Sequence, residues 1–331
     1  MTLLADVAEL PVLSAGGVTY RWSDVFLAAR LRGEWDAVAE SAAAPEAPSD
    51  DDALRRAGIA FRTERRLLAA DELRDWLARH RLTLEDWNAY LRRRLGPGSR
   101  AQSEPPAGAL WAEGACSGAL ERFAHALAAR AAALAAEPDT EAGAPPADWF
   151  ARMPARAEAA ALGVPADDVP GRCAELWRGE AAYESLRAAV IESDAPKRAL
   201  AAGSADWLRV DCEYVVAADE SVAREAALLL REDGMPLVDV ARAAGLEPVD
   251  GRPYVGEMPP ELRTRAISAA PGDRIGPIAV DGGSLFVVMS VRGKVAPSMD
   301  DPEIRARAES AAVQKAVERE ISGRVTWHEH G

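Results

Sequence analysis

Lysine is nearly absent from this 331-residue chain: Lys197, Lys294 and Lys315 are its only lysines, and arginine supplies the rest of its 39 basic residues. Acidic residues outnumber basic ones, 53 to 39, so the formal net charge is -14. Proteins that bind nucleic acids need a clustered Lys/Arg surface for the phosphates. The composition therefore argues against a nucleic-acid partner.

Long apolar runs are also missing. No segment approaches the roughly 20 apolar residues that a membrane-spanning helix requires. Residues 1–11 contain Asp6 and Glu9 but no basic segment, so they do not have the pattern of a secretory signal peptide. We therefore expect no membrane partner and a cytoplasmic protein.

Cysteine and histidine are scarce and scattered. Cys116, Cys173 and Cys212 are odd in number and form no CxxC pair, which favours reduced, structural thiols. His328 and His330 could share one face of a strand, but two ligands are too few for a zinc site. With no Gly-rich phosphate loop and no nucleophile–base pair, the sequence predicts no metal, no cofactor and no conventional catalytic residues.

The first two thirds of the chain have mainly helical patterns, interrupted at residues 42–52, 96–108 and 137–148 by Pro-, Gly- and acid-rich segments. A hairpin is expected over 12–20, around Gly16-Gly17. The predicted helices cover 22–31, the region from 61 to 95, 109–136 and 173–191. Thr83 is the expected N-cap of the helix that ends before Gly96. We expect these helices to serve as packing elements.

After Trp207 the pattern changes to alternating strands and short helices. Strands are predicted at 210–216, 275–280, 285–291 and 325–327, and helices at 221–231, 235–244, 261–269 and 302–321. Ser221 is the expected cap of the first of these helices. The last has Asp301 as its expected N-cap and Gly323 just past its end. The chain is thus predicted to be an α+β protein.

Two motifs in this region resemble the parvulin family of prolyl isomerases. They are residues 255–262 (VGEMPPEL), similar to the parvulin PPE turn, and residues 270–277 (APGDRIGP), which lead into the last hairpin. The N-terminal third is similar to the helical, peptide-binding part of SurA- and PpiC-type chaperones. Without a signal peptide, the chain looks more like the cytoplasmic parvulin-related proteins of peptide maturation.

The resemblance implies an isomerase pocket, but both of its histidines are missing. The first-strand position falls at Glu213, and the last-strand position falls at Phe286 or Val287. Met258 and Leu262 keep the apolar wall. The peptide-binding residues implied by the parvulin pocket are Glu213, Tyr214, Met258, Leu262 and Phe286. Glu213 should either face solvent or meet a cation, because an unpaired carboxylate is costly among apolar residues.

The resemblance also implies a domain organisation. A SurA-like domain (1–96), a linker (97–108) and a helical region (109–206) precede a parvulin-like antiparallel-sheet domain (207–297). The last segment, 298–331, is expected to be a helix and strand that return to the N-terminal domain.

The function that follows is a non-catalytic peptide-binding accessory protein or chaperone. Its partner would be a precursor peptide of a ribosomal, crocagin-like natural-product pathway or an unfolded segment, together with the tailoring enzymes of that pathway. The acidic surface favours a basic or neutral ligand. An active prolyl isomerase and a general holdase are the alternatives.

Overall fold

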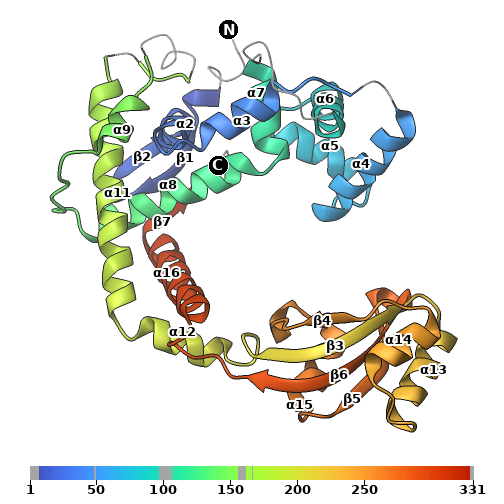
Figure 1. The fold of residues 1–331 in the computed structure, drawn as a ribbon. Coiled ribbons are helices and arrows are strands. Elements are labelled where there is room, and N and C mark those ends of the chain that lie inside the picture. Colours follow the sequence, from blue (N-terminus) through green and yellow to red (C-terminus); the bar gives the residue numbers. More distant parts are fainter. Residues whose placement is uncertain are drawn as a thin grey trace. The chain divides into compact units, whose positions relative to one another are not determined.

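The computed structural model describes residues 7–47, 50–96, 105, 107–155, 162–165 and 167–328, so most of the expected linker at 97–108 lies outside the described residues. The protein is a mixed α+β chain with two antiparallel sheets (Figure 1). It divides into two compact units, residues 1–188 with 316–331 (unit 1) and residues 189–315 (unit 2).

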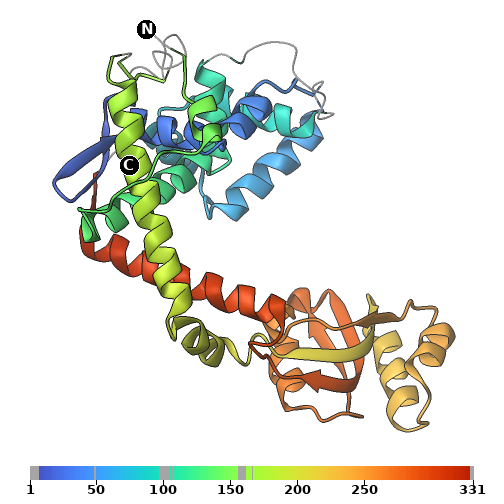
Figure 2. The same cartoon turned by 60° about the vertical axis from the view of Figure 1, so that its left-hand side comes forward.

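The sheet of unit 1 joins segments from opposite ends of the sequence. Its strands are β1 (Pro11–Ala15), β2 (Val18–Arg21) and β7 (Val325–Trp327), in the order β2-β1-β7. Gly16 and Gly17 have φ values of +58° and +82°, which is the left-handed backbone that a tight hairpin turn requires. β7 follows α16 (Pro302–Arg324) and pairs with β1, so the central strand is covered on both edges (Figure 2).

Helices form the rest of unit 1 and supply most of its core. They are α2 (Trp22–Leu31), α3 (Trp35–Ala42), α4 (Asp51–Glu64), α5 (Ala70–Arg79), α6 (Leu84–Leu95), α7 (Ala107–Cys116), α8 (Ala119–Ala136), α9 (Ala147–Ala151) and α11 (Val169–Glu192). Phe26, Leu27 and Leu127 are among the fully buried side chains. Thr83 caps α6 as expected, because its hydroxyl accepts from the Asp86 amide at 3.1 Å.

Unit 2 includes α12 (Ala195–Gly203) and is built around a four-stranded sheet. The strands are β3 (Arg209–Ala217), β4 (Val249–Gly251), β5 (Arg274–Val280) and β6 (Leu285–Val295), in the order β4-β3-β6-β5. Every neighbouring pair is antiparallel.

Each face of this sheet packs against its own helices. Helices α13 (Glu220–Arg231) and α14 (Leu237–Ala244) cover the face that includes Val215 and Val288. The short η1 (Val255–Glu257) and α15 (Pro260–Ser268) cover the other, with Cys212 and Met289. Gly276 lies so close to β6 that a Cβ atom would stand 2.5 Å from the Val287 carbonyl oxygen, so only glycine fits there.

Some local expectations were wrong. Asp219, rather than Ser221, caps α13, since its carboxylate accepts from the Ser221 and Val222 amides at 2.7 and 3.4 Å. α16 continues to Arg324, so Gly323 lies inside the helix and does not end it. The three cysteines are free and buried, as expected. Within the described part of the chain, no helix is long and apolar enough to span a membrane.

Candidate functional site

The predicted peptide-binding residues of unit 2 do not lie on one surface. Tyr214, Met258 and Leu262 belong to the apolar cluster between the sheet and α15. Met258 and Leu262 are each 5% exposed, so this wall is closed by its own packing.

Glu213 and Phe286 lie on the opposite face of the sheet. Successive strand residues point to opposite faces, so a shift of one position moves a side chain to the other side. Phe286 packs against the apolar cluster under α13 and α14, whereas Val287 lies with Met289 in the cluster on the α15 face. A single groove lined by all five predicted residues is therefore not formed.

Glu213 forms an ion pair with an arginine, which is one of the two outcomes expected for it from the sequence. Arg292 of β6 donates to the Glu213 carboxylate at 2.9 Å and to that of Asp211 at 2.6 Å. It also binds Asp250 of β4, and this hydrogen bond holds the pKa of Asp250 below its ordinary value. The cluster ties three strands together.

Cys212 lies beside the closed wall, and burial raises the pKa of its thiol to about 11. The thiol is thus protonated near neutral pH, whereas the thiolate is the nucleophilic form. Cys212 is a packing residue.

A large cavity lies in unit 1, in a region whose helices were expected to serve only as packing elements. Its volume is about 800 Å³, which falls in the range of sites that bind small molecules or peptide side chains. α5, α7, α8, the start of α2, the segment before β1 and β7 all contribute. The lining residues are Val7, Leu10, Trp22, Ala78, Arg79, His80, Arg81, Trp111, Ala115, Leu120, Glu121, Ala124, His125 and Trp327.

Tryptophans form much of the apolar lining. Trp22 and Trp111 are 6% and 4% exposed, and their rings meet edge to face at 5.4 Å. Trp327 of β7 is 40% exposed, and its ring centroid lies 5.5 Å from that of His125. Rigid aromatic surfaces of this kind bind apolar side chains with little loss of conformational entropy.

The C-terminus of α5 brings a backbone turn to the cavity. The Leu82 amide donates to the Leu77 carbonyl at 2.8 Å and the Arg81 amide to the Ala78 carbonyl at 3.0 Å, which is the Schellman pattern. The carbonyl of His80, which has no partner within the helix, accepts from the Trp111 indole at 2.6 Å. Trp111 thus lines the cavity and fixes this turn.

His80 is neutral near pH 7. Burial lowers its pKa, and the hydrogen bond to the Trp76 carbonyl offsets this in part. That bond, 2.8 Å from Nδ1, places the proton on Nδ1 because a carbonyl can only accept. The ring also stacks on Trp76 with centroids 4.2 Å apart. These contacts hold His80 in one orientation.

Most of the exposed residues of this lining are polar or charged. Arg79, Arg81, Glu121 and His125 are all exposed, whereas Leu120 and Ala124 beneath them are buried. The site therefore combines an aromatic floor with a polar rim, an arrangement suited to a segment with both apolar and charged groups.

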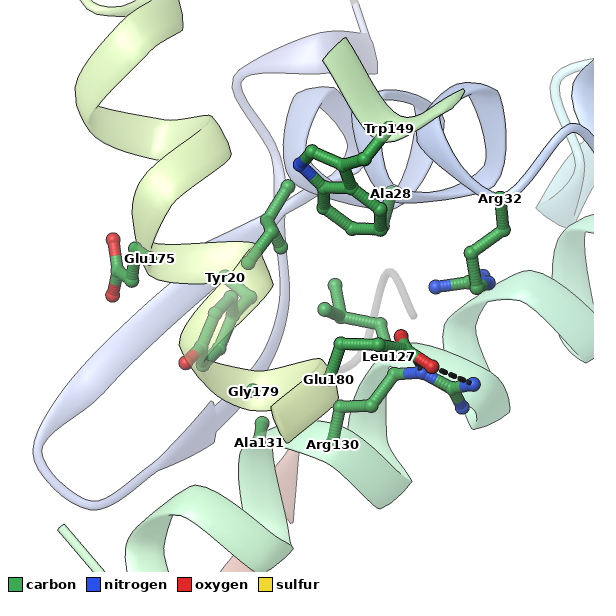
Figure 3. A pocket seen from close by; sticks show the side chains of 11 residues that line it. Tyr20, Ala28, Arg32, Leu127, Arg130, Ala131, Trp149, Glu175, Gly179 and Glu180 are labelled. Carbon is green, nitrogen blue, oxygen red and sulfur yellow. Dashed lines mark hydrogen bonds and ion pairs between the residues drawn. The ribbon is translucent and has the colours of Figure 1, made fainter. Parts of the chain in front are cut away.

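A second hollow of unit 1 is too small for a ligand. It lies between α2, α8, α9 and α11 and has a volume of about 10 Å³, roughly the space of one water molecule. Arg130 of α8 and Glu180 of α11 form an ion pair there at 2.9 Å (Figure 3). This hollow is a packing gap beside a structural ion pair.

No protein-family model and no curated protein match the sequence. A solved structure that resembles it is the peptidylprolyl isomerase PrsA from Bacillus anthracis. The likeness covers 47% of this chain and 81% of that chain, with 15% sequence identity and a TM-score of 0.24. A likeness this weak carries no inference about activity, which therefore depends on the residues of this chain.

Proposed function

We propose that the protein is a peptide-binding accessory protein or chaperone that holds a peptide segment in the unit 1 cavity without changing it covalently. The observation that carries this proposal is the open cavity of about 800 Å³, whose lining combines the buried tryptophans Trp22 and Trp111 with exposed polar and charged side chains. Its volume accommodates two or three apolar side chains of a peptide.

The sheet of unit 1 offers a second means of holding a peptide. β2 and β7 are its edge strands, and Trp327 of β7 lines the cavity. An extended segment beside Trp327 could hydrogen-bond to an edge while its side chains enter the cavity, as in strand addition. Affinity should be micromolar, about -8 kcal/mol, because the peptide loses conformational freedom on binding.

The non-catalytic part of the proposal is supported by unit 2. Its parvulin-like pocket positions carry Tyr214, Met258 and Leu262 in a closed apolar cluster, and the adjacent Cys212 thiol is protonated. The finer proposal, a precursor peptide of a ribosomal natural-product pathway that is later processed by tailoring enzymes, rests on the motif resemblance to peptide-maturation proteins.

Isothermal titration with synthetic peptides that contain two or three adjacent apolar residues tests the proposal, with mass spectrometry of the recovered peptide. Saturable micromolar binding and an unchanged peptide mass are expected. Two other results would contradict the proposal and indicate a different function. Accelerated cis–trans isomerisation of X-Pro bonds would show that the protein is a prolyl isomerase. Equal suppression of aggregation for unrelated unfolded proteins would show that it is a general holdase.

A further inference from the structure

We propose that the unit 1 cavity selects peptide segments that carry a carboxylate next to an aromatic or branched apolar residue, and that Arg79 and Arg81 bind this carboxylate. The inference rests on the proposed function and specifies the chemistry of its ligand. The apolar side chain would occupy the space over Trp22 and Trp111, and the acidic group would remain at the rim.

The first argument is that both guanidinium groups are available. Arg79 and Arg81 line the cavity and are exposed, and among the described residues neither side chain forms a hydrogen bond or an ion pair. Many other arginines of the chain do have carboxylate partners, such as Arg130 with Glu180 and Arg292 with Glu213. An arginine pair beside an apolar cavity fits a carboxylate, which a guanidinium can bind through two parallel hydrogen bonds.

The second argument is the backbone of Arg81. Its φ is +53°, the left-handed conformation that closes the Schellman turn after α5 and that normally favours glycine. An arginine here adds backbone strain and in return carries a guanidinium to the cavity. Arg66 has the same conformation after α4, with φ +57°, but does not line the cavity. The strain alone therefore does not mark a binding residue; Arg81 is distinguished because it combines the strain with a position in the cavity lining.

The third argument is the local balance of charge. Glu121 is the acidic residue of the lining, His80 is neutral near pH 7, and the two arginines leave the rim positive. The net charge of the whole chain, -14, has the opposite sign. At physiological ionic strength charges are screened beyond about 8 Å, so neighbouring groups decide the preference at the rim. The basic or neutral ligand expected from the overall charge is thus replaced by an acidic one.

Three blocked synthetic peptides test the inference. They share a Phe-Leu centre and differ only in the residues that flank it: glutamate, glutamine or lysine. At low ionic strength the glutamate peptide should bind the full-length protein about tenfold more tightly than the glutamine peptide, since its two carboxylates can form two exposed ion pairs and such a pair contributes up to about fivefold. The lysine peptide should bind most weakly, and 0.5 M NaCl should reduce the differences.

Variants then assign the preference to the two arginines. In the double variant Arg79→Gln, Arg81→Gly the glutamate-to-glutamine ratio should fall to nearly one. Arg66→Gly removes the same backbone strain away from the cavity and should keep the tenfold ratio. Circular dichroism confirms that each variant is folded.

The possible failures are distinguishable. Equal binding of the glutamate and glutamine peptides, or a ratio that survives in the double variant, would overturn the inference and leave the proposed function standing. No binding of any of the three peptides would contradict the proposed function as well. A dimer seen by sedimentation that dissociates in the double variant would assign the cavity to a second copy of the chain and also overturn the inference.

Discussion

Strand β7 should contribute a measurable part of the stability of unit 1, and deleting residues 325–331 tests this. β7 makes three residue pairs with β1, Leu13 with Trp327, Ser14 with Thr326 and Ala15 with Val325. The His328 amide donates to the Val12 carbonyl at 2.9 Å. Without β7, the central strand β1 becomes an edge with unpaired backbone groups.

The magnitude follows from these contacts. A backbone hydrogen bond contributes about 1 kcal/mol net, and the burial of Trp327 is largely offset by the cost of ordering the strand. The deletion should therefore destabilise unit 1 by about 3 kcal/mol, which lowers the melting temperature by roughly 6–12 °C for a unit of this size.

Tryptophan fluorescence measures this in the whole protein, because eight of the nine tryptophans, all except Trp207, lie in unit 1. Thr326→Ala is the matched control: its side chain is exposed, and the backbone of β7 is kept, so a change within about 0.5 kcal/mol is expected. An unchanged melting temperature of the deletion variant would refute the reasoning.

Three further predictions follow from local features. Burial lowers the pKa of His80, so the unfolded chain binds a proton at this residue more readily than the folded chain. The free energy of unfolding should therefore fall as the pH drops from 6.5 towards the pKa of His80 in the folded protein. Denaturant titrations at several pH values should show that His80→Gln removes this pH dependence. Arg81→Gly and Arg66→Gly should each raise the free energy of unfolding by about 0.5–1 kcal/mol, because glycine adopts the left-handed conformation without strain. A lower free energy of unfolding in both variants would show instead that the arginine side chains stabilise the turns. Purified protein should not accelerate the cis–trans isomerisation of X-Pro peptide bonds, which takes tens to hundreds of seconds without a catalyst. An acceleration that disappears in Tyr214→Ala would place an isomerase site in unit 2.

Much of the secondary structure could be predicted from the sequence, because it depends on short-range signals. The Gly16-Gly17 turn, the Thr83 cap and the strands at 210–216 and 285–291 all lie where the pattern placed them. The three-residue β4 was missed, since Val249–Gly251 has too few residues to show an alternation. The end of α16 was misplaced because glycine can also lie inside a helix that packing stabilises.

The sites were harder to predict, because they depend on long-range packing. Alignment with a motif placed Glu213 and Phe286 in a groove, but the alternation of the strands puts them on the opposite face from Met258. The unit 1 cavity joins Trp22, Trp111 and Trp327, which are up to 305 residues apart in the sequence, and no local pattern brings them together. Arg81 lies inside the region from 61 to 95 that was expected to be helical, and the left-handed conformation of an arginine leaves no local signal in the sequence.

The measurement that tests the central claim most directly is peptide titration against a variant whose cavity is filled. Ala78 is exposed and lines the cavity from the last turn of α5, so Ala78→Trp should occupy the space without disturbing the core. Ala70→Trp, at an exposed position in the first turn of the same helix, is the matched control. Binding of the Phe-Leu peptides should weaken at least tenfold in Ala78→Trp and stay unchanged in Ala70→Trp. Equal affinity of both variants and the original protein would contradict the claim that the cavity holds the peptide.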